Sequence, residues 1–367
     1  MGNMDQTELK YWLAFAKLNI LRHRDFLFFK NRFPKLEKFW QASYLDLLEV
    51  GLPERIAQNF IRQRKLINPE TELSNFYSTD MGVLTYDDTA FPSRLKEISC
   101  PPLILFYRGD KNILSKNLFA IVGTRIFSRY GELATKLITQ EVIDNQLTPV
   151  SGLALGIDAI VHDICNKNNF PNVAVLGSGI DDKSIYPRKN FYLAQEIIEK
   201  NGILLSEYAP GTQALKQNFP ARNRLISGLS LGTLVTEAKE KSGALITAHF
   251  ALEQNREVFA LPGGIDNINS IGTNNLIKKG AKLVSNINDI LEELNISKKQ
   301  NAISNTFIKI TEEEKNILTI LGNGSKHIDE IAQLCHKTIN EINVLMLELE
   351  MKGAINHLGD MNYSLKI

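Results

Sequence analysis

Between residues 117 and 295, short apolar runs alternate with stretches whose apolar positions recur at helical spacing. Runs of this length that end in turn residues are typical of buried strands, and the stretches between them predict helices. The alternation predicts βαβ units around a mostly parallel sheet, an α/β and Rossmann-like core that we place at residues 80–296. Within this core, a proline-punctuated strand from Cys100 to Asp110 precedes the βαβ units. The predicted strands of the core are FAIVG, LTPVSG, VAVLG, ILLSE, LGTLVTE, EVFALPG and AKLV.

The chain before this core has a helical pattern. Apolar residues recur at spacings of three and four in YWLAFAKLNI and in YLDLLEVGLPERIAQNFIRQR, so residues 1–75 are expected to form a small helical domain. The run from Leu47 to Arg62 is broken at Val50-Gly51-Leu52-Pro53, which is typical of a tight turn between helices. We interpret the domain as a helix-hairpin-helix or SAM-like module. Such hairpins often bind DNA phosphates through backbone N–H groups, although a packing role is the more common alternative.

The chain after the core changes in composition. Residues 297–305 are polar and basic, so they are interpreted as a linker. Residues 306–367 predict three helices followed by a hairpin, which favours a winged-helix-like domain. Residues 305–367 hold six lysines, no arginine and nine acidic residues, a charge unfavourable for binding phosphates. We expect this domain to contact protein or to have a structural role. The predicted helices begin near Thr311, His327 and Thr338, and the strands lie around Ile355 and Ser364.

The composition excludes several classes of protein. Of 367 residues, 44% are hydrophobic and 23% charged, as in ordinary globular proteins. The three cysteines form no CxxC pair, which predicts neither a disulfide framework nor a zinc site and fits a reducing cytoplasm. No apolar run approaches the ~20 residues of a membrane span, so we expect no signal peptide and no membrane segment. Because the net charge is only +1, an anionic ligand would need a local basic cluster.

The carboxyl ends of the predicted strands carry the candidate chemistry. One strand ends in Gly123, Thr124 and Arg125, shortly before a helix begins near Tyr130. Backbone N–H groups at a helix start attract phosphate, and an arginine binds phosphate through two hydrogen bonds. The carboxyl ends of parallel strands meet at one edge, where ligands bind, although ordinary tight turns would also use these glycines. The other strand ends carry Ser151-Gly152, Gly177-Ser178-Gly179, Ser206-Glu207 and Pro262-Gly263-Gly264.

Two further segments mix aromatic, proline and basic residues, YPRKN from Tyr186 to Asn190 and FPARNR from Phe219 to Arg224. Basic side chains neutralise phosphates and aromatic rings stack on unpaired bases, so this mixture favours single-stranded over double-stranded nucleic acid. The alternative is that Tyr186 and Phe219 are core anchors and the cations lie on solvated loops. The first helix has no GxGxxG sequence and the chain has no GxxxxGK[ST] loop, which disfavours NAD and ATP.

In order along the chain, the motifs IVGTR, SGLALGID, VLGSGID with YPRKN, LLSEYAPGT, NFPARNRLISGLS, VTEAKEKSGALITAHFALEQNREVFALPGGI and SIGTNNLIKKGA resemble those of DprA, the DNA-processing (Smf) family. The resemblance covers about Phe91 to Val284. It implies a Rossmann-like homodimer that binds and protects single-stranded DNA during natural transformation and loads the RecA recombinase onto it. The helical and winged-helix-like domains resemble small domains that many members carry at either end.

The resemblance also implies which residues contact DNA. The family's phosphate-binding triplet falls on Gly123, Thr124 and Arg125, although the family more often has serine at the position of Thr124. Its Tyr-Pro-x-x-Asn turn falls on Tyr186, Pro187 and Asn190, and NFPxRNR falls on Asn218 to Arg224. The candidate DNA contacts are Gly123, Thr124, Arg125, Ser151, Gly152, Gly177, Gly179, Arg188, Lys189, Asn190, Phe219, Arg222, Asn223 and Arg224.

A nucleotide-hydrolysing enzyme is the main alternative, since phosphoribohydrolases share a Rossmann-like fold and a PGGxGTxxE motif whose start resembles Pro262-Gly263-Gly264. Here Gly272-Thr273 comes late and Leu276 replaces the glutamate, so the carboxylate for acid–base catalysis is missing. Glu207 and Glu237 are other candidate bases, although such residues often fix loops or cap helices. We therefore expect no catalysis and no cofactor. A regulator that reads duplex DNA with its winged helix is disfavoured by the acidic C-terminal domain. The dimer surface and the RecA-contacting residues carry no recognisable pattern.

Overall fold

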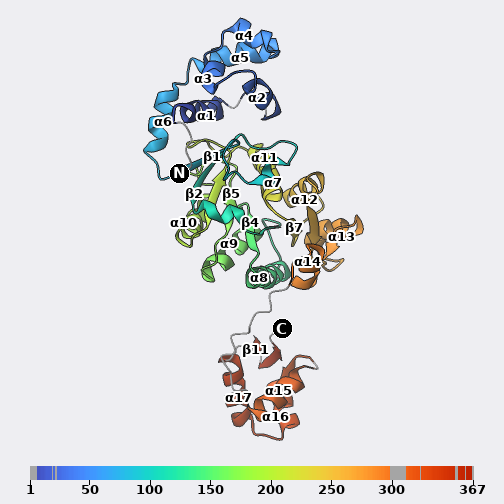
Figure 1. Cartoon of the computed structure of the whole chain (residues 1–367). Helices are drawn as coiled ribbons and strands as arrows, with labels where there is room; N and C mark the ends of the chain where they lie inside the picture. The colour runs from blue at the N-terminus through green and yellow to red at the C-terminus, as the bar shows by residue number, and fades with distance from the viewer. Residues whose placement is uncertain are drawn as a thin grey trace. The chain divides into compact units, whose positions relative to one another are not determined.

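The computed structural model describes residues 6–18, 20, 23–297, 311–322, 324–351, 354–359 and 361–365 (Figure 1). The chain divides into two compact units, residues 1–299 and residues 300–367. Most of the expected linker at 297–305 lies outside the described residues. Within the described ranges, no helix combines the length and the apolar character that crossing a membrane requires.

A nine-stranded sheet organises the larger unit, in the order β1-β2-β6-β5-β4-β3-β7-β8-β9. The strands β3 to β9 pair in parallel, while β1 and β2 add an antiparallel edge beside β6. The mostly parallel, Rossmann-like sheet expected from the sequence is therefore confirmed. The strands are β1 (Gly82–Thr85), β2 (Ile104–Gly109), β3 (Leu118–Val122), β4 (Thr148–Ser151), β5 (Val173–Val175), β6 (Ile203–Ser206), β7 (Gly232–Val235), β8 (Glu257–Ala260) and β9 (Lys282–Leu283).

Helices cover both faces of this sheet (Figure 1). Apolar residues of α7, α11, α12 and α13 pack on one face, and those of α8, α9, α10 and α14 pack on the other. The chain leaves β3 and β7, which are neighbours, towards opposite faces, so the strand order reverses between them. In doubly wound folds ligands bind in the crevice at this position, beyond the carboxyl ends of the strands. The helices are α7 (Ser93–Lys96), α8 (Arg129–Asp144), α9 (Ile157–Lys167), α10 (Phe191–Glu199), α11 (Asn218–Leu229), α12 (Gly243–Glu253), α13 (Ile271–Lys278) and α14 (Ile287–Glu293).

The N-terminal part of the same unit is helical, as its pattern predicts. Its core is a cluster of buried rings that includes Phe15, Phe26, Phe39 and Phe60 and continues to Phe106 in β2, so these helices pack onto the sheet. The predicted break at residues 50–53 separates α4 from α5, where Gly51 has a φ of 90° that other residues rarely adopt. The helices are α1 (Gln6–Leu18), α2 (His23–Lys30), α3 (Leu36–Gln41), α4 (Tyr44–Glu49), α5 (Glu54–Arg64) and α6 (Pro69–Tyr77).

In its described residues the smaller unit has three helices and a three-stranded sheet in the order β10-β12-β11, which confirms the expected winged helix. Thr311 caps the first helix, and Glu314 completes the capping box. The described lysines Lys315, Lys326 and Lys337 each form an ion pair with a glutamate of the same unit. The elements are α15 (Glu312–Leu321), β10 (Lys326–His327), α16 (Ile328–Cys335), α17 (Ile339–Met351), β11 (Ile355–Gly359) and β12 (Asn362–Leu365).

Candidate nucleic-acid interface

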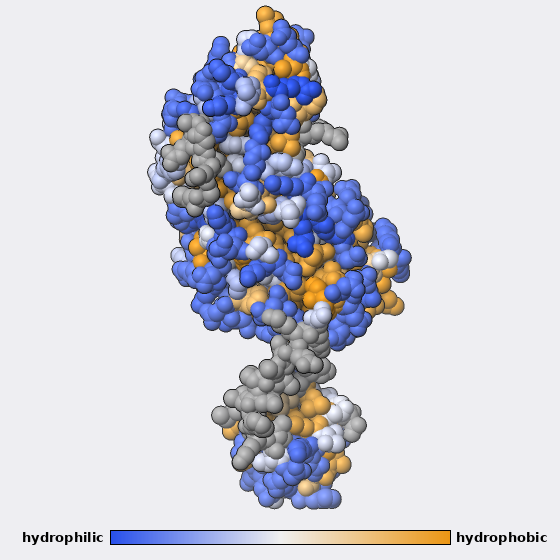
Figure 2. All heavy atoms as spheres, viewed as in Figure 1, coloured by the Kyte–Doolittle hydropathy of each residue, from blue (hydrophilic) through white to orange (hydrophobic). Residues whose placement is uncertain are grey.

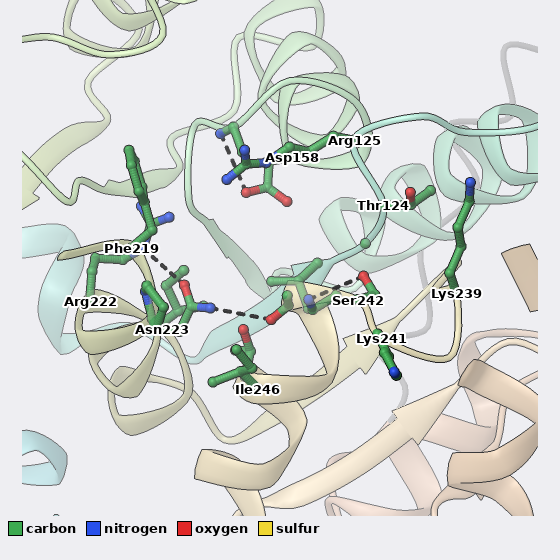
Figure 3. A pocket seen from close by; sticks show the side chains of 18 of the residues that line it. Thr124, Arg125, Asp158, Phe219, Arg222, Asn223, Lys239, Lys241, Ser242 and Ile246 are labelled. Atoms are coloured by element: carbon green, nitrogen blue, oxygen red, sulfur yellow. Dashed lines mark hydrogen bonds between the residues drawn. The ribbon is translucent and has the colours of Figure 1, made fainter. Parts of the chain in front are cut away.

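A pocket of about 610 Å³ lies at the carboxyl ends of β3 and β7, where the strand order reverses. The segment after β3 contributes Gly123, Thr124 and Arg125 to its lining. Figure 3 shows that Phe219, Arg222 and Asn223 come from one helix, α11, while Lys239, Lys241 and Ser242 come from the loop that leads to α12. Residues separated by more than 100 positions in the chain therefore meet at one site.

The lining of this pocket is strongly basic. It contains Arg125, Lys216, Arg222, Lys239 and Lys241, against the single carboxylate of Asp158. All of these cations except Arg222 are exposed, and they form no salt bridge with a described residue. Because the whole chain is nearly neutral, this local excess is the kind of cluster that attracts a polyanion.

Aromatic rings lie among these cations. The ring centres of Tyr186 and Phe219 are 5.6 Å apart, and the guanidinium carbon of Arg125 lies 5.7 Å from the centre of the Phe219 ring. A smaller hollow that also includes Gly152 and Leu155 shares these three residues with the main pocket. Tyr186 is half-exposed. The site thus combines positive charge with a flat, accessible aromatic surface.

Arg222 forms part of the pocket lining, and its Nη1 and Nε groups donate to atoms of the protein. The side chain is buried, and Nη1 donates a hydrogen bond to the Gly152 carbonyl at 2.8 Å and another to the Val175 carbonyl. Burial lowers the pKa of Arg222 to about 10, an effect that the nearby Asp158 carboxylate opposes. A Cβ on Gly152 would lie 2.8 Å from atoms of both Arg222 and Asp158, so this position requires glycine. Arg222 therefore ties the ends of β4 and β5 to α11.

Asp158 is also part of this lining. Its Oδ2 accepts hydrogen bonds from the backbone N–H groups of Gly152 at 3.1 Å and Ala154 at 3.4 Å, which fixes the segment after β4. Burial raises the pKa of Asp158, and Arg222 together with these backbone donors opposes the rise. The one carboxylate of the pocket thus has a structural task.

The start of α8 differs from the expectation of a phosphate site. Ser128 is the N-cap of this helix, and the Glu237 carboxylate accepts a hydrogen bond from the Ser128 backbone N–H at 2.9 Å and another from its hydroxyl. Glu237 is fully buried. The helix start therefore already holds a protein anion, and an external phosphate would meet a like charge there. By contrast, residues at the start of α12, namely Ser242, Gly243 and Ala244, line the pocket.

The chain matches the family described as DNA recombination-mediator protein A over residues 82–295 and the DprA winged helix domain over residues 308–361. It belongs to this family. Protein Smf of Escherichia coli is 37% identical over 329 residues, which are 86% of this chain and 87% of that protein. The DNA processing protein DprA of Bacillus subtilis is 39% identical over 271 residues, 71% of this chain and 89% of that protein.

Two solved structures of the family resemble this fold. The structure of DNA processing protein A from Streptococcus pneumoniae superposes with a TM-score of 0.68 at 34% identity and covers 79% of this chain and 98% of that one. The protein from Helicobacter pylori, whose structure describes a single-stranded DNA binding mode, superposes with a TM-score of 0.53 at 31% identity and covers 59% of this chain and 95% of that one. The DprA/Smf resemblance of the sequence is confirmed.

Several of the expected contact residues lie outside the main pocket. Arg224 follows Arg222 by two positions on α11 and points to another side of the helix, where it pairs with Glu207 and lines a different cavity. Arg188 donates to the Asp182 carbonyl and lies over the Phe191 ring, and neither it nor Lys189 lines the pocket. Of the three candidate arginines Arg125, Arg188 and Arg224, only Arg125 therefore lines the main pocket.

Other expected residues support the pocket from below. Ser151 donates its hydroxyl hydrogen bond to the Ile121 carbonyl at 2.7 Å, and Asn190 donates to the carbonyls of Leu153 and Ala154. A Cβ on Gly177 would approach the Phe219 ring to 3.2 Å. A Cβ on Gly179 would lie 2.7 Å from an oxygen of Asp181. Ser151 and Asn190 thus fix the backbone behind the pocket, and the two glycines leave little room for a side chain.

The sequence reasoning missed Lys216, Lys239 and Lys241. Lys216 stands three positions before Phe219, and the other two belong to the family motif VTEAKEKSG. The available signal was their place between a predicted strand and the following helix, on the edge already assigned to the ligand.

Proposed function

We propose that this family member binds single-stranded DNA in the pocket between β3 and β7. The observation that carries the proposal is the contact of Arg125 with Phe219, beside Tyr186 and among Lys216, Lys239 and Lys241. Cations that track a phosphate backbone together with aromatic rings that stack on bases are the two elements of single-strand binding. The single-stranded DNA named for the Helicobacter pylori relative supports the same assignment.

The position of the rings favours an unpaired strand. Phe219 and Tyr186 belong to concave surfaces, so a base must leave a stack to reach their faces. Only unpaired bases offer these faces without breaking base pairs. Phosphates on either side of such a base would contact Lys216, Lys239 and Lys241, which line the pocket. Binding through charge and stacking predicts little preference for particular bases.

We propose no catalytic role for the strand-end glutamates. Glu237 accepts hydrogen bonds from Ser128 and Asn267, and Glu207 pairs with Arg224. Both carboxylates thus have structural partners. Incubation of the protein with nucleoside monophosphates is expected to release no free base. Release that disappears in a Glu237→Gln variant would support the phosphoribohydrolase alternative instead.

Family membership supports the wider role. We propose that the protein works in the cytoplasm as a homodimer that protects single-stranded DNA and loads the RecA recombinase onto it. Its smaller unit has an acidic composition and paired lysines, which favours contact with protein over contact with phosphates.

We propose that an apolar face beside the pocket carries the dimer contact. Tyr130, Leu133 and Leu137 are exposed on one side of α8. The Tyr130 hydroxyl donates to the Pro262 carbonyl, and Asn269 donates to the Ile126 carbonyl, so α8 and the loop before α13 are neighbours. That loop exposes Ile265 and Ile268. Figure 2 shows that the surface of the larger unit carries apolar areas. A large exposed apolar area is typical of a protein interface.

The direct test is a binding titration with single-stranded and double-stranded oligonucleotides of equal length at several salt concentrations. Single-strand affinity is expected to exceed duplex affinity and to fall with salt, because each phosphate contact releases a counterion. Equal affinity for both forms, or no dependence on salt, would contradict the proposed site.

A further inference from the structure

A second cavity, of about 710 Å³, lies in the same unit between the helical N-terminal part and the sheet. Its walls come from the end of α1, the segment Cys100–Ile104, the loop 207–212 that follows β6, and α11. Because β6 belongs to the parallel set, this loop lies at the same edge of the sheet as the first pocket. The function proposed above does not account for this cavity.

Both cavities take part of their lining from α11. Pro220 and Asn223 line the first pocket, while the next residue after each, Ala221 and Arg224, lines the second cavity. Pro220 and Ala221 are exposed and small, so nothing bulky from this stretch of the helix stands between the two openings. A helix with its side chains is about 10 Å across, a span that a few nucleotides of an extended strand can cover.

The second cavity, like the first, combines cations with an aromatic ring. Its cations are Arg224, which pairs with Glu207, and Lys17, which pairs with Glu72. Tyr208 and Pro210 are partly exposed in its wall, and the buried Phe15, Pro101 and Pro102 form the apolar base behind them. The loop that carries Tyr208 is held in place, because Gly211 donates a hydrogen bond to Asp181 and Gly179 donates to the Thr212 carbonyl. Aromatic and apolar walls with guanidinium and ammonium groups suit nucleotides that continue from the first pocket.

Arg224 keeps hydrogen-bonding capacity at this wall. Its Nη2 pairs with Glu207, whereas Nη1 has no hydrogen-bond partner among the described residues. An arginine carries five N–H donors, so one carboxylate does not exhaust it. A buried donor without a partner is rare in folded proteins and asks for a ligand or a water.

We infer that this second cavity binds further nucleotides of the same single strand that occupies the first pocket, so that the strand crosses α11 between them. The inference rests on the proposed function and extends it. It assigns the helical N-terminal part a role, because α1 supplies one wall of the strand's path.

Cys100 provides a test without a foreign label, since it is exposed and lines the second cavity, whereas Cys165 is buried. In a Cys335→Ser background, Cys100 is alkylated with a bulky maleimide in the presence of saturating oligothymidylate. An oligonucleotide of about 20 residues is expected to slow alkylation at least about fivefold, while one of about 4 residues, which fills only the first pocket, leaves the rate unchanged. An unchanged rate with the saturating long strand overturns the inference, as does equal protection by the short one.

Charge at the same position gives a second, independent measurement. Cys100→Glu places a carboxylate on the strand's path, and Cys100→Gln is the neutral control. Affinity for the long oligonucleotide is expected to fall roughly threefold to tenfold in the Glu variant alone, with the short oligonucleotide bound normally by both. Equal affinity of both variants for the long strand contradicts the inference. That result is expected if the second cavity binds a protein segment instead of DNA. If the unmodified protein binds neither oligonucleotide, the proposed function fails, and this outcome is separate from failure of the second cavity.

Discussion

The guanidinium of Arg125, from the loop after β3, lies over the ring of Phe219, which comes from α11 nearly a hundred residues later. A cation at this distance is attracted to the face of an aromatic ring, and the contact holds both groups at the mouth of one pocket. A phosphate bound by Arg125 and a base stacked near Phe219 would then be close enough to belong to the same or to successive nucleotides. This pair therefore gives the sharpest tests of the site.

Arg125→Ala is expected to weaken single-strand binding about tenfold and to lower the slope of log affinity against log salt by about 0.7, because one phosphate contact is lost. The measurement is a fluorescence-anisotropy titration at four or more salt concentrations. Lys116→Ala is the matched control, since Lys116 is exposed and precedes β3, at the opposite edge of the sheet. If both variants bind alike, Arg125 does not contact the backbone.

Phe219→Ala is expected to weaken binding by about 1–3 kcal/mol, which is the contribution of one stacked base, without changing the salt slope. Comparison with an oligonucleotide that is abasic throughout isolates the effect, because that ligand keeps the phosphates and lacks the bases. The variant and the original protein are expected to bind the abasic strand equally. Phe219→Trp keeps a stacking face and serves as the conservative control. A loss that is equal for both ligands would assign Phe219 to packing.

Lys239→Gln with Lys241→Gln is expected to reduce the salt slope by about 1.4, twice the value of one single-strand phosphate contact, with little effect on unfolding. Both side chains are exposed in the loop after β7, so removing their charge disturbs no packing. Lys278→Gln with Lys279→Gln, an exposed pair at the end of α13, is the control of equal charge. Equal slopes in the two double variants would exclude the loop from the DNA path.

The strands and their order along the chain could be predicted because buried strands are written in apolar runs that turn residues separate. The predicted runs coincide with β3 to β9, and the strand within Cys100–Asp110 is β2. The break between α4 and α5 at Gly51 could also be predicted, since a positive φ favours a residue without a side chain. The pairing of β2 with β6 could not be predicted, because a long stretch of the chain separates the two strands.

The sequence placed the candidate residues at the edge of the sheet where the pocket lies, but it did not distinguish the residues that line the pocket from those that support it. Sequence spacing places Arg222 and Arg224 on the same helix, but it does not tell which of the two side chains reaches the pocket. Because two positions along a helix correspond to a rotation of more than half a turn, the two side chains point to different sides. Burial also decides roles. Asn190 and Arg222 donate hydrogen bonds to backbone carbonyls near the ends of β4 and β5. The sequence does not show that these carbonyls lie next to the two side chains in the fold.

Leu133→Asp with Leu137→Asp is expected to convert a dimer into monomers, because both side chains are more than half exposed on α8 and a buried carboxylate is costly in an interface. The thermal midpoint of unfolding of the monomer is expected to change little. Sedimentation equilibrium measures the mass directly. Leu252→Asp, a comparably exposed leucine on α12, is the control. Retention of the dimer mass in the double variant would place the interface elsewhere.

His162 is expected to make the fold sensitive to acid. It is fully buried on α9, where Nδ1 lies 2.6 Å from Asn172 Oδ1 and Nε2 has no partner among the described residues. Burial lowers the pKa of His162 from 6.5 to about 4, and the charge of Arg222 adds to this effect. Between these values the unfolded chain binds a proton that the folded chain excludes, so acidification favours unfolding.

The free energy of unfolding is therefore expected to be unaffected by His162 above pH 6.5 and to fall by about 3 kcal/mol as the pH drops to 4. Urea titrations across this range measure the change. His162→Gln keeps a polar side chain without a titrating ring, so the difference between its pH profile and that of the original protein isolates the histidine. His249→Gln, at an exposed position of α12, is expected to retain the original profile. Parallel pH profiles of the free energy of unfolding for His162→Gln and the original protein would mean that His162 has the same pKa in the folded and unfolded states. The buried ring would then be protonated below pH 6.5, and Asn172 would accept a hydrogen bond from a charged imidazolium.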